Sequence, residues 1–130
     1  MTHPADRKYS KSHEWFKMEG KEGRVGISHH AQDHLGDVVF VELPAIGKVV
    51  KQGEQLCVVE SVKAVADCYA PISGKVVRVN ENLTADPALL NRDPHGDGWI
   101  CVVEPSDPGE VAGLMEQAAY EKFCEEESGH

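Results

Sequence analysis

One short sequence occurs twice, on either side of an apolar segment with a single lysine near its middle. Residues 47–50 read Gly-Lys-Val-Val, and residues 74–77 have the same four residue types. The apolar segment, residues 58–67, is rich in β-branched valine and contains no glycine, proline or asparagine, which favours a strand. An internal repeat of strand-forming sequence predicts two similar β units around a centre, with Lys63 between them.

The size and charge of the chain limit its possible functions. A chain of 130 residues is long enough for its own hydrophobic core, so we expect a single domain over residues 1–130. The net charge of −9 disfavours binding to nucleic acids, and no apolar run is long enough to span a membrane. The first six residues have neither a signal core nor an arginine-rich presequence. We expect a cytoplasmic monomer without nucleic-acid or membrane partners, or a mitochondrial protein if a leader has been removed.

The N-terminal half of the chain is predicted to form short strands and one helix. Two strand-like segments, residues 15–18 and 24–27, are joined through a glycine-containing hairpin turn. Ser28 can cap a short helix that ends at Gly36, and residues 38–43 form a further strand.

Helical turns are predicted after residue 83. Asp86 can cap a helical turn through residue 90, residues 93–98 are rich in turn formers, and residues 99–103 form a buried strand. Together with the preceding strands, this order predicts a mainly β fold with appended short helices, typical of a sandwich or barrel.

The two ends of the chain are predicted to differ from its centre. Residues 1–8 are polar and are expected to form a loose arm. Residues 106–130 are expected to form a C-terminal helical segment, in which Ser106 caps a first piece and residues 115–125 form the last helix. The apolar face of that last helix would consist of Met115, Ala119 and Phe123.

The cysteines and histidines are not predicted to bind a metal. The four cysteines lack CxxC spacing, so reduced thiols are expected. A two-residue turn at residues 62–63 would place Cys57 directly opposite Cys68, where a disulfide is geometrically possible, but buried thiols are the more usual state. His30 and His34 share one helical face, yet no third ligand is assigned beside them.

The lysine segment resembles that of a known family. Residues 60–65, Glu-Ser-Val-Lys-Ala-Val, followed by Tyr-Ala-Pro-Ile-Ser-Gly at residues 69–74, are similar to the lipoyl-attachment segment of glycine cleavage H proteins. Further motifs of the family occur in the same order at residues 12–15, 25–27, 35–44, 79–81, 93–94 and 98–99. Two positions depart from the family: His95 stands where tyrosine is usual, and Cys57 replaces a bulkier apolar residue.

The resemblance implies a barrel-sandwich hybrid fold of the lipoyl-domain type, with lipoate in amide linkage to Lys63 on an exposed hairpin. It also implies that Glu60 and Ser61 are recognised by a lipoylating enzyme. The family residues that hold the loaded arm in a surface cleft are matched here by Ser12, Glu14, His34 and Asp67. Each of these residues could also be an ordinary surface or strand-end side chain.

The function implied by the resemblance is that of a carrier and not an enzyme. The lipoyl arm would accept the aminomethyl group of glycine at the P protein, a glycine decarboxylase, and deliver it to the T protein, an aminomethyltransferase. The L protein, a dihydrolipoyl dehydrogenase, would reoxidise the arm. No glycine-framed serine elbow or phosphate-binding glycine loop occurs in the chain, which weighs against an independent enzyme.

Other functions remain open at this point. An H-like protein could donate lipoyl or octanoyl groups to other proteins through the same lysine. An unmodified interaction domain could use the same fold. A biotin carrier is less favoured, because Val62 and Ala64 flank the lysine where biotin domains usually have methionines. An enzyme with a histidine-based site is the most remote alternative.

Overall fold

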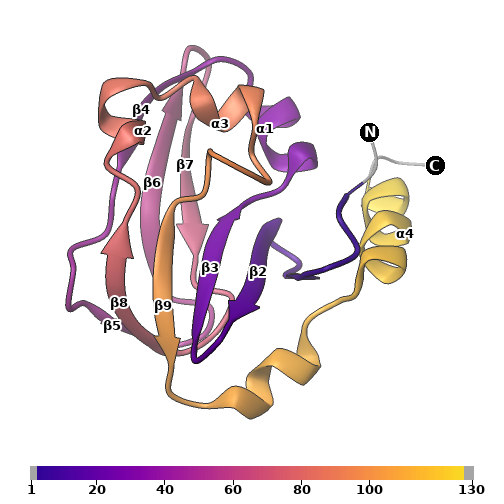
Figure 1. The fold of residues 1–130 in the computed structure, drawn as a ribbon. Coiled ribbons are helices and arrows are strands. Elements are labelled where there is room, and N and C mark those ends of the chain that lie inside the picture. The colour runs from indigo at the N-terminus through magenta and orange to yellow at the C-terminus, as the bar shows by residue number, and fades with distance from the viewer. Residues whose placement is uncertain (1–2, 128–130) are drawn as a thin grey trace.

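Two antiparallel β-sheets pack face to face in the computed structural model, which describes residues 3–127 (Figure 1). The larger sheet has the strand order β1-β2-β3-β9-β8-β5, and the smaller has the order β4-β6-β7. The strands are β1 (Lys8–Tyr9), β2 (Glu14–Glu19), β3 (Glu22–Ile27), β4 (Val38–Glu42), β5 (Val49–Val50), β6 (Gln55–Ser61), β7 (Val65–Tyr69), β8 (Gly74–Val79) and β9 (Cys101–Pro105). The helices are α1 (His29–Leu35), α2 (Asn82–Ala85), α3 (Leu89–Arg92), the 3-10 helix η1 (Pro108–Gly113) and α4 (Gln117–Glu127). The mainly β architecture with short helices confirms the predicted fold class.

The repeated Gly-Lys-Val-Val sequences lie side by side in the larger sheet. Strand β5 pairs with β8 in antiparallel orientation, with Val50 opposite Gly74. The pairing extends beyond β5, because the N–H of Gly47 donates to the carbonyl of Val76 at 2.7 Å. The two repeated sequences therefore pair directly with each other and do not surround a centre, and the β6–β7 hairpin lies between them only in the sequence.

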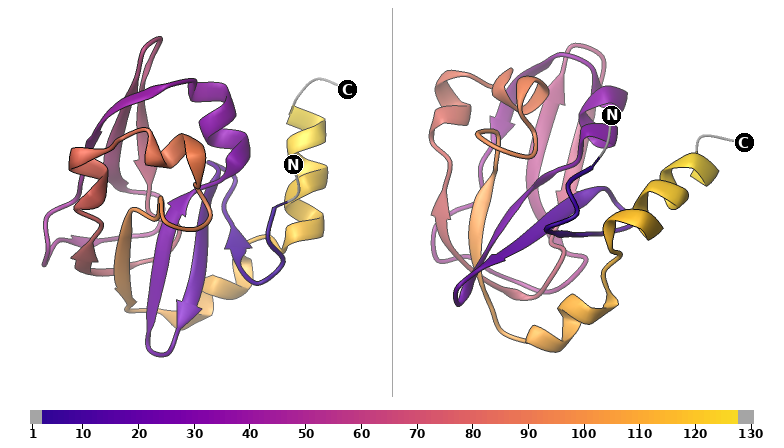
Figure 2. Two further views of the ribbon diagram at one scale, coloured as in Figure 1. Left: turned by 45° about the horizontal axis from the view of Figure 1, so that its top comes forward. Right: turned by 45° about the vertical axis from the view of Figure 1, so that its right-hand side comes forward.

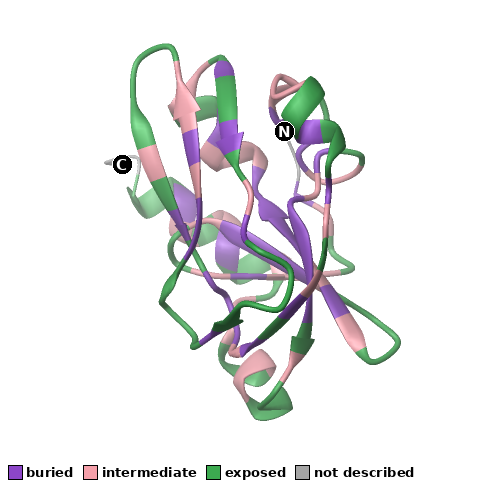
Figure 3. Cartoon of the chain, turned by 90° about the vertical axis from the view of Figure 1, so that its left-hand side faces the viewer, coloured by how far each residue is buried: buried purple, intermediate pink, exposed green. Residues whose placement is uncertain are grey.

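The hydrophobic core fills the space between the sheets (Figure 3). Val59 of β6 and Val76 of β8 are completely buried. Burying an aliphatic side chain of this size stabilises a fold by about 1.5–3 kcal/mol. The core also contains Phe16, Val25, Ile27, Val38, Val41, Leu56, Ile72, Leu83, Leu90, Ile100 and Val103. Residues from both sheets contribute, so the core holds the two layers together.

Helix α1 begins and ends where the sequence predicts. The N–H of Ala31 donates to the hydroxyl of Ser28 at 3.2 Å, and Gly36 ends the helix with φ of +77°. Asn91 of α3 fixes the loop that follows, because its side chain donates to the carbonyl of Gly36 and accepts from the N–H of Val38. Helices α1, α2 and α3 thus lie at the same end of the sandwich as the β6–β7 tip (Figure 1).

The helical turn predicted to be capped by Asp86 begins later in the structure. Residues Asn82–Ala85 form the helix α2, which the sequence analysis missed, and Asp86 ends it. Helix α3 then starts at Leu89 without a side-chain cap. The carboxylate of Asp86 pairs with the Arg92 side chain instead of capping a helix.

The prediction that Ser106 caps the next helical piece is wrong by one residue. Asp107 is the cap, and its carboxylate accepts from the N–H of Gly109 at 3.1 Å. Pro108 explains the difference, because proline is suited to the first helical position and makes the preceding residue the cap.

The last helix starts at Gln117, and Met115 precedes it. Met115 forms a β-bridge with Tyr9, with both backbone hydrogen bonds at 2.8 Å, so its backbone is extended. The buried residues of α4 are Tyr120 and Cys124. Of the predicted face, Met115 and Phe123 are partly buried and pack against these residues, whereas Ala119 is exposed. No helix in residues 3–127 is long and apolar enough to cross a membrane.

The described part of the N-terminal arm, residues 3–8, packs against α4, which differs from the loose arm expected (Figure 2). His3 is 5% exposed, and its N–H donates to the Glu121 carboxylate at 3.1 Å. The rings of Tyr9 and Tyr120 stack at 4.5 Å between centroids. Tyr9, Trp15, Tyr120 and Cys124 form a second, smaller core, which attaches both ends of the chain to the sandwich.

His95, one of the two departures from the family pattern, is half-buried beside this arm. Its Nε2 accepts from the N–H of His29 at 3.2 Å, and its carbonyl accepts from Arg7 at 2.7 Å. Burial lowers the pKa of His95 to about 4. His95 therefore acts as a neutral acceptor that joins the loop before β9 to α1.

Candidate functional site

The β6–β7 hairpin protrudes at one end of the sandwich (Figure 1). Lys63 lies in the turn between the two strands and is exposed. The register of the hairpin runs from Glu60 opposite Val65 to Cys57 opposite Cys68, as predicted. The two cysteines are buried thiols. The hydrogen bond with Cys57, together with burial, raises the pKa of the Cys68 thiol, so Cys68 stays protonated at neutral pH.

Ser61 builds the turn that displays the lysine. Its N–H donates to the carbonyl of Ala64 at 2.8 Å, which closes a two-residue turn. Its hydroxyl oxygen accepts from the N–H groups of Lys63 at 3.3 Å and Ala64 at 3.1 Å. Serine hydroxyls stabilise turns in this way when glycine and asparagine are absent. This role in the turn is additional to the recognition by a lipoylating enzyme that the family resemblance implies for Ser61.

The loop after α1 supports the hairpin tip. The N–H of Val62 donates to the carbonyl of Asp37 at 3.0 Å. The stem of Lys63 lies against Gly36, since a Cβ added to Gly36 would be 3.2 Å from Lys63 Cε. The missing side chain at Gly36 therefore leaves room for the lysine stem beside the end of α1.

We predict that Gly36→Ala destabilises the fold by about 1–3 kcal/mol, because alanine tolerates the backbone conformation at φ +77° poorly and its methyl group would crowd Lys63. Gly113→Ala is the matched control, since a Cβ there meets no atom within 4 Å. The control should change stability by less than about 0.5 kcal/mol. Urea unfolding of the two variants and the parent measures the difference. Equal stability of Gly36→Ala and the parent would contradict this role of Gly36.

A cavity of about 230 Å³ lies between β7, α1 and the segment that enters β2. All four residues assigned to a cleft by the sequence resemblance line it: Ser12, Glu14, His34 and Asp67. The remaining lining residues are His13, Ile27, Ala31, Leu35, Ala66 and Cys68. The cavity therefore combines an apolar wall with several polar groups.

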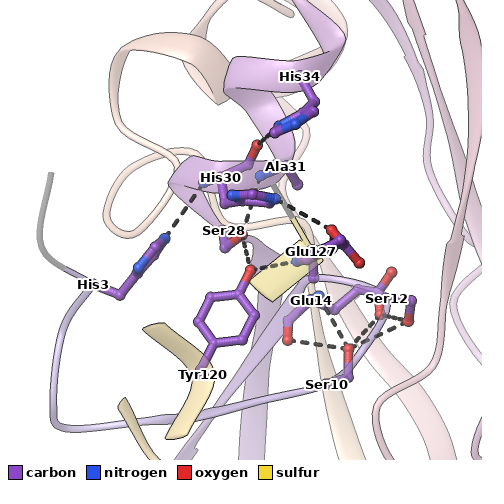
Figure 4. Close-up of polar contacts among 11 residues, drawn as sticks. His3, Ser10, Ser12, Glu14, Ser28, His30, Ala31, His34, Tyr120 and Glu127 are labelled. Carbon is purple, nitrogen blue, oxygen red and sulfur yellow. Dashed lines mark hydrogen bonds and ion pairs between the residues drawn. The ribbon is translucent and has the colours of Figure 1, made fainter. Parts of the chain in front are cut away.

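Glu14 is the most constrained of these residues, with 2% exposure. Its Oε1 accepts from the hydroxyls of Ser10, at 2.7 Å, and Ser12 (Figure 4). Its Oε2 accepts from the N–H of Tyr69 at 3.1 Å. Burial raises the pKa of Glu14, and the hydrogen bonds oppose that shift. The carboxylate thus connects β2 of the larger sheet to β7 of the smaller one.

Asp67 and His34 are exposed at the cavity, in contrast to Glu14. The carboxylate of Asp67 accepts from the side chain of Gln55 at 2.8 Å. Nδ1 of His34 lies 2.9 Å from the carbonyl of His30, and their rings are 4.3 Å apart (Figure 4). The negative charge of Asp67 is therefore the one most accessible to a ligand entering the cavity from this side.

The sequence model of the glycine cleavage H-protein family matches residues 7–127. The chain belongs to the glycine cleavage H-protein family. A glycine cleavage system H protein of Symbiobacterium thermophilum is 58% identical, over 95% of this chain and 96% of the relative. One of Thermotoga maritima is 53% identical, over 93% and 98%. The mitochondrial H protein 2 of Arabidopsis thaliana is 57% identical, over 94% of this chain and 78% of its own length.

A solved structure of an H protein supports the same assignment. The crystal structure of a glycine cleavage system H protein from Mycobacterium marinum is similar with a TM-score of 0.84 and 41% identity, over 92% of this chain and 96% of that chain. The two sheets of this H-family chain therefore form the predicted lipoyl-domain-like barrel-sandwich hybrid.

Proposed function

We propose that this protein is the lipoyl-bearing shuttle of a glycine cleavage system, with lipoate attached through an amide to Lys63. The observation that carries this proposal is the position of Lys63 on a turn fixed by Ser61 and exposed to solvent. A carrier lysine must be reachable by several enzymes, and this amine is the one displayed at the tip of the hairpin. The chain serves as a covalent substrate of its partners and not as a catalyst.

The residues around the cavity fit such an arm. Amide formation would remove the charge of Lys63 and leave an apolar extension, which suits the wall formed by Ile27, Ala31 and Leu35. A bound lipoyl group supplies a disulfide that can be reduced and can carry an aminomethyl group. The amine of that cargo would be cationic near neutral pH. Asp67 and the Ser12–Glu14 hydrogen-bonded pair offer the polar groups that a sheltered cation requires.

The expected partners follow from this role. The P protein would load the arm, the T protein would unload it, and the L protein would reoxidise it. A lipoylating enzyme would recognise the hairpin through Glu60 and Ser61, which lie at the end of β6 next to the lysine. Ser61 would then have two functions, because it also stabilises the turn.

Two predictions from the sequence stay predictions. Donation of lipoyl or octanoyl groups to other proteins would use the same lysine and turn, so it is the alternative function. A cytoplasmic location is also still a prediction, since a similar chain of Arabidopsis thaliana is named as mitochondrial.

Mass spectrometry tests the attachment site. We expect protein produced with lipoate and a lipoylating enzyme to carry one lipoyl group, on the peptide that contains Lys63. Lys48 and Lys75 occupy equivalent places in the repeated sequence and serve as internal controls. Lipoylation at either control lysine in place of Lys63 would overturn the assignment.

A further inference from the structure

Three potential metal ligands from three distant segments meet beside the cavity. His13 precedes β2, His30 lies in α1 and Cys124 lies in α4. One ligand atom from each, a ring nitrogen of either histidine and the sulfur of Cys124, lies within 4.8 Å of the other two. His34, which shares a helical face with His30, lies outside this group, and its Nδ1 faces the His30 carbonyl.

His13 is held in an unusual conformation that directs its ring into this group. It is the one non-glycine residue in residues 3–127 with a positive φ, +73°. Two backbone hydrogen bonds fix it, from its own N–H to Ser10 at 3.1 Å and from Ser28 to its carbonyl at 2.9 Å. The rings of His13 and His30 are 4.5 Å apart. Strained backbone of this kind persists where the surrounding structure requires a particular side-chain position.

A carboxylate already lies between the two imidazoles. Oε1 of Glu127 is 2.7 Å from Nε2 of His13. The same oxygen is 3.4 Å from Nε2 of His30 (Figure 4). Nδ1 of His13 is 2.7 Å from the hydroxyl of Tyr120, which also contacts Ser28 at 2.6 Å. The contact between Nδ1 of His13 and Tyr120 supplies the second layer of hydrogen bonds that usually orients a metal-binding imidazole.

We propose that His13, His30 and Cys124 form a binding site for a zinc-class divalent ion, with the Glu127 carboxylate as the fourth ligand. Two imidazoles and one thiolate favour Zn²⁺ or Co²⁺ over Mg²⁺ or Ca²⁺, which prefer oxygen ligands. Zinc holds nitrogen at about 2.0–2.1 Å and sulfur at about 2.3 Å, so its ligand atoms lie about 3.3–3.8 Å apart. The ligand atoms of His13, His30 and Cys124, which lie within 4.8 Å of one another, would therefore move closer together on binding. Binding would release the Cys124 thiol proton to solvent.

The site would connect α4 to the rest of the molecule. His13 and His30 belong to the segments that line the cavity, whereas Cys124 and Glu127 belong to the last helix. Figures 1 and 2 show α4 standing at the side of the sandwich, next to the N-terminal segment. A metal ion at this point would stabilise the docked position of α4 in addition to the small Tyr9–Tyr120 core.

Metal titration of the chelator-treated full-length chain tests the proposal without any lipoyl chemistry. We expect one Co²⁺ per chain, with a thiolate-to-cobalt charge-transfer band in the near ultraviolet, and displacement of Co²⁺ by one Zn²⁺. At about 100-fold excess over the dissociation constant, Zn²⁺ should raise the melting temperature by roughly 5–10 °C.

Variants identify the ligands. Cys124→Ser should remove the charge-transfer band, while His13→Asn and His30→Gln should weaken binding at least about tenfold. Asparagine is chosen because it tolerates positive φ. His29→Gln and Cys57→Ala are the controls, since neither residue belongs to the group, and both should bind as the parent does. Circular dichroism verifies the fold of each variant. A parent titration without the band, or a Cys124→Ser variant that retains it, would overturn the site.

Discussion

Replacing Lys63 with arginine will abolish glycine decarboxylation through this protein in a reconstituted glycine cleavage assay. Arginine keeps the positive charge and most of the stem, but its guanidinium stays protonated and offers no amine for the lipoyl amide. Lys63 is exposed at the tip of the hairpin, so the variant should unfold within about 0.5 kcal/mol of the parent. The assay measures carbon dioxide release from glycine with the P, T and L proteins present.

Lys75→Arg is the matched control for this experiment. Lys75 is also exposed, and it occupies a repeated Gly-Lys-Val-Val sequence away from the hairpin tip. The control should show full activity. Decarboxylation that continues through Lys63→Arg at the rate of the control would exclude a lipoyl arm on Lys63.

The second large effect is expected when the carboxylates at the cavity are neutralised. Asp67→Asn combined with Glu14→Gln should release the aminomethyl cargo to water about tenfold faster in the absence of T protein, which corresponds to about 1.4 kcal/mol. One lost hydrogen bond to a charged group is enough for an effect of this size. Release of formaldehyde and ammonia from the loaded protein measures the rate.

Single variants separate the two carboxylates. Asp67 is exposed, so Asp67→Asn tests the charge with little change in stability. Glu14 accepts hydrogen bonds from Ser10, Ser12 and Tyr69, and Glu14→Gln should therefore also lower the free energy of unfolding by about 1–3 kcal/mol. Asp33→Asn, an exposed position on α1, is the control. If the double variant and the parent release the cargo at equal rates, no carboxylate holds the amine here.

The hairpin and α1 could be predicted from sequence because short-range rules decide them. Cys57 and Cys68 are the same number of residues away from the turn at residues 62–63. A two-residue turn there therefore predicts the pairing register of the hairpin, with Cys57 opposite Cys68. Ser28 and Gly36 mark the ends of α1 through a side-chain cap and a positive φ. The role of Ser61 in the turn was missed, although a serine hydroxyl two residues before Lys63 is a known turn former.

The parts that could not be predicted depend on contacts between distant segments. Met115 lies outside the last helix because it pairs with Tyr9, more than a hundred positions earlier. The same applies to the group of His13, His30 and Cys124, since these residues come from three separate elements. Only the family resemblance predicted which residues line the cavity, because no local sequence pattern indicates that Ser12 lies near Asp67.

The turn at Ser61 determines which part of this carrier moves. Hydrogen bonds to the Ser61 hydroxyl and from Val62 to Asp37 hold the backbone on both sides of Lys63. The backbone of the hairpin tip is therefore fixed. A group attached to Lys63 would change position through rotation about the single bonds of the lysine side chain and of the attached arm. A partner enzyme that binds the tip then meets a preorganised surface and loses little backbone entropy on docking. Each encounter can then be brief and weak, as the proposed role of a shuttle between enzymes would require.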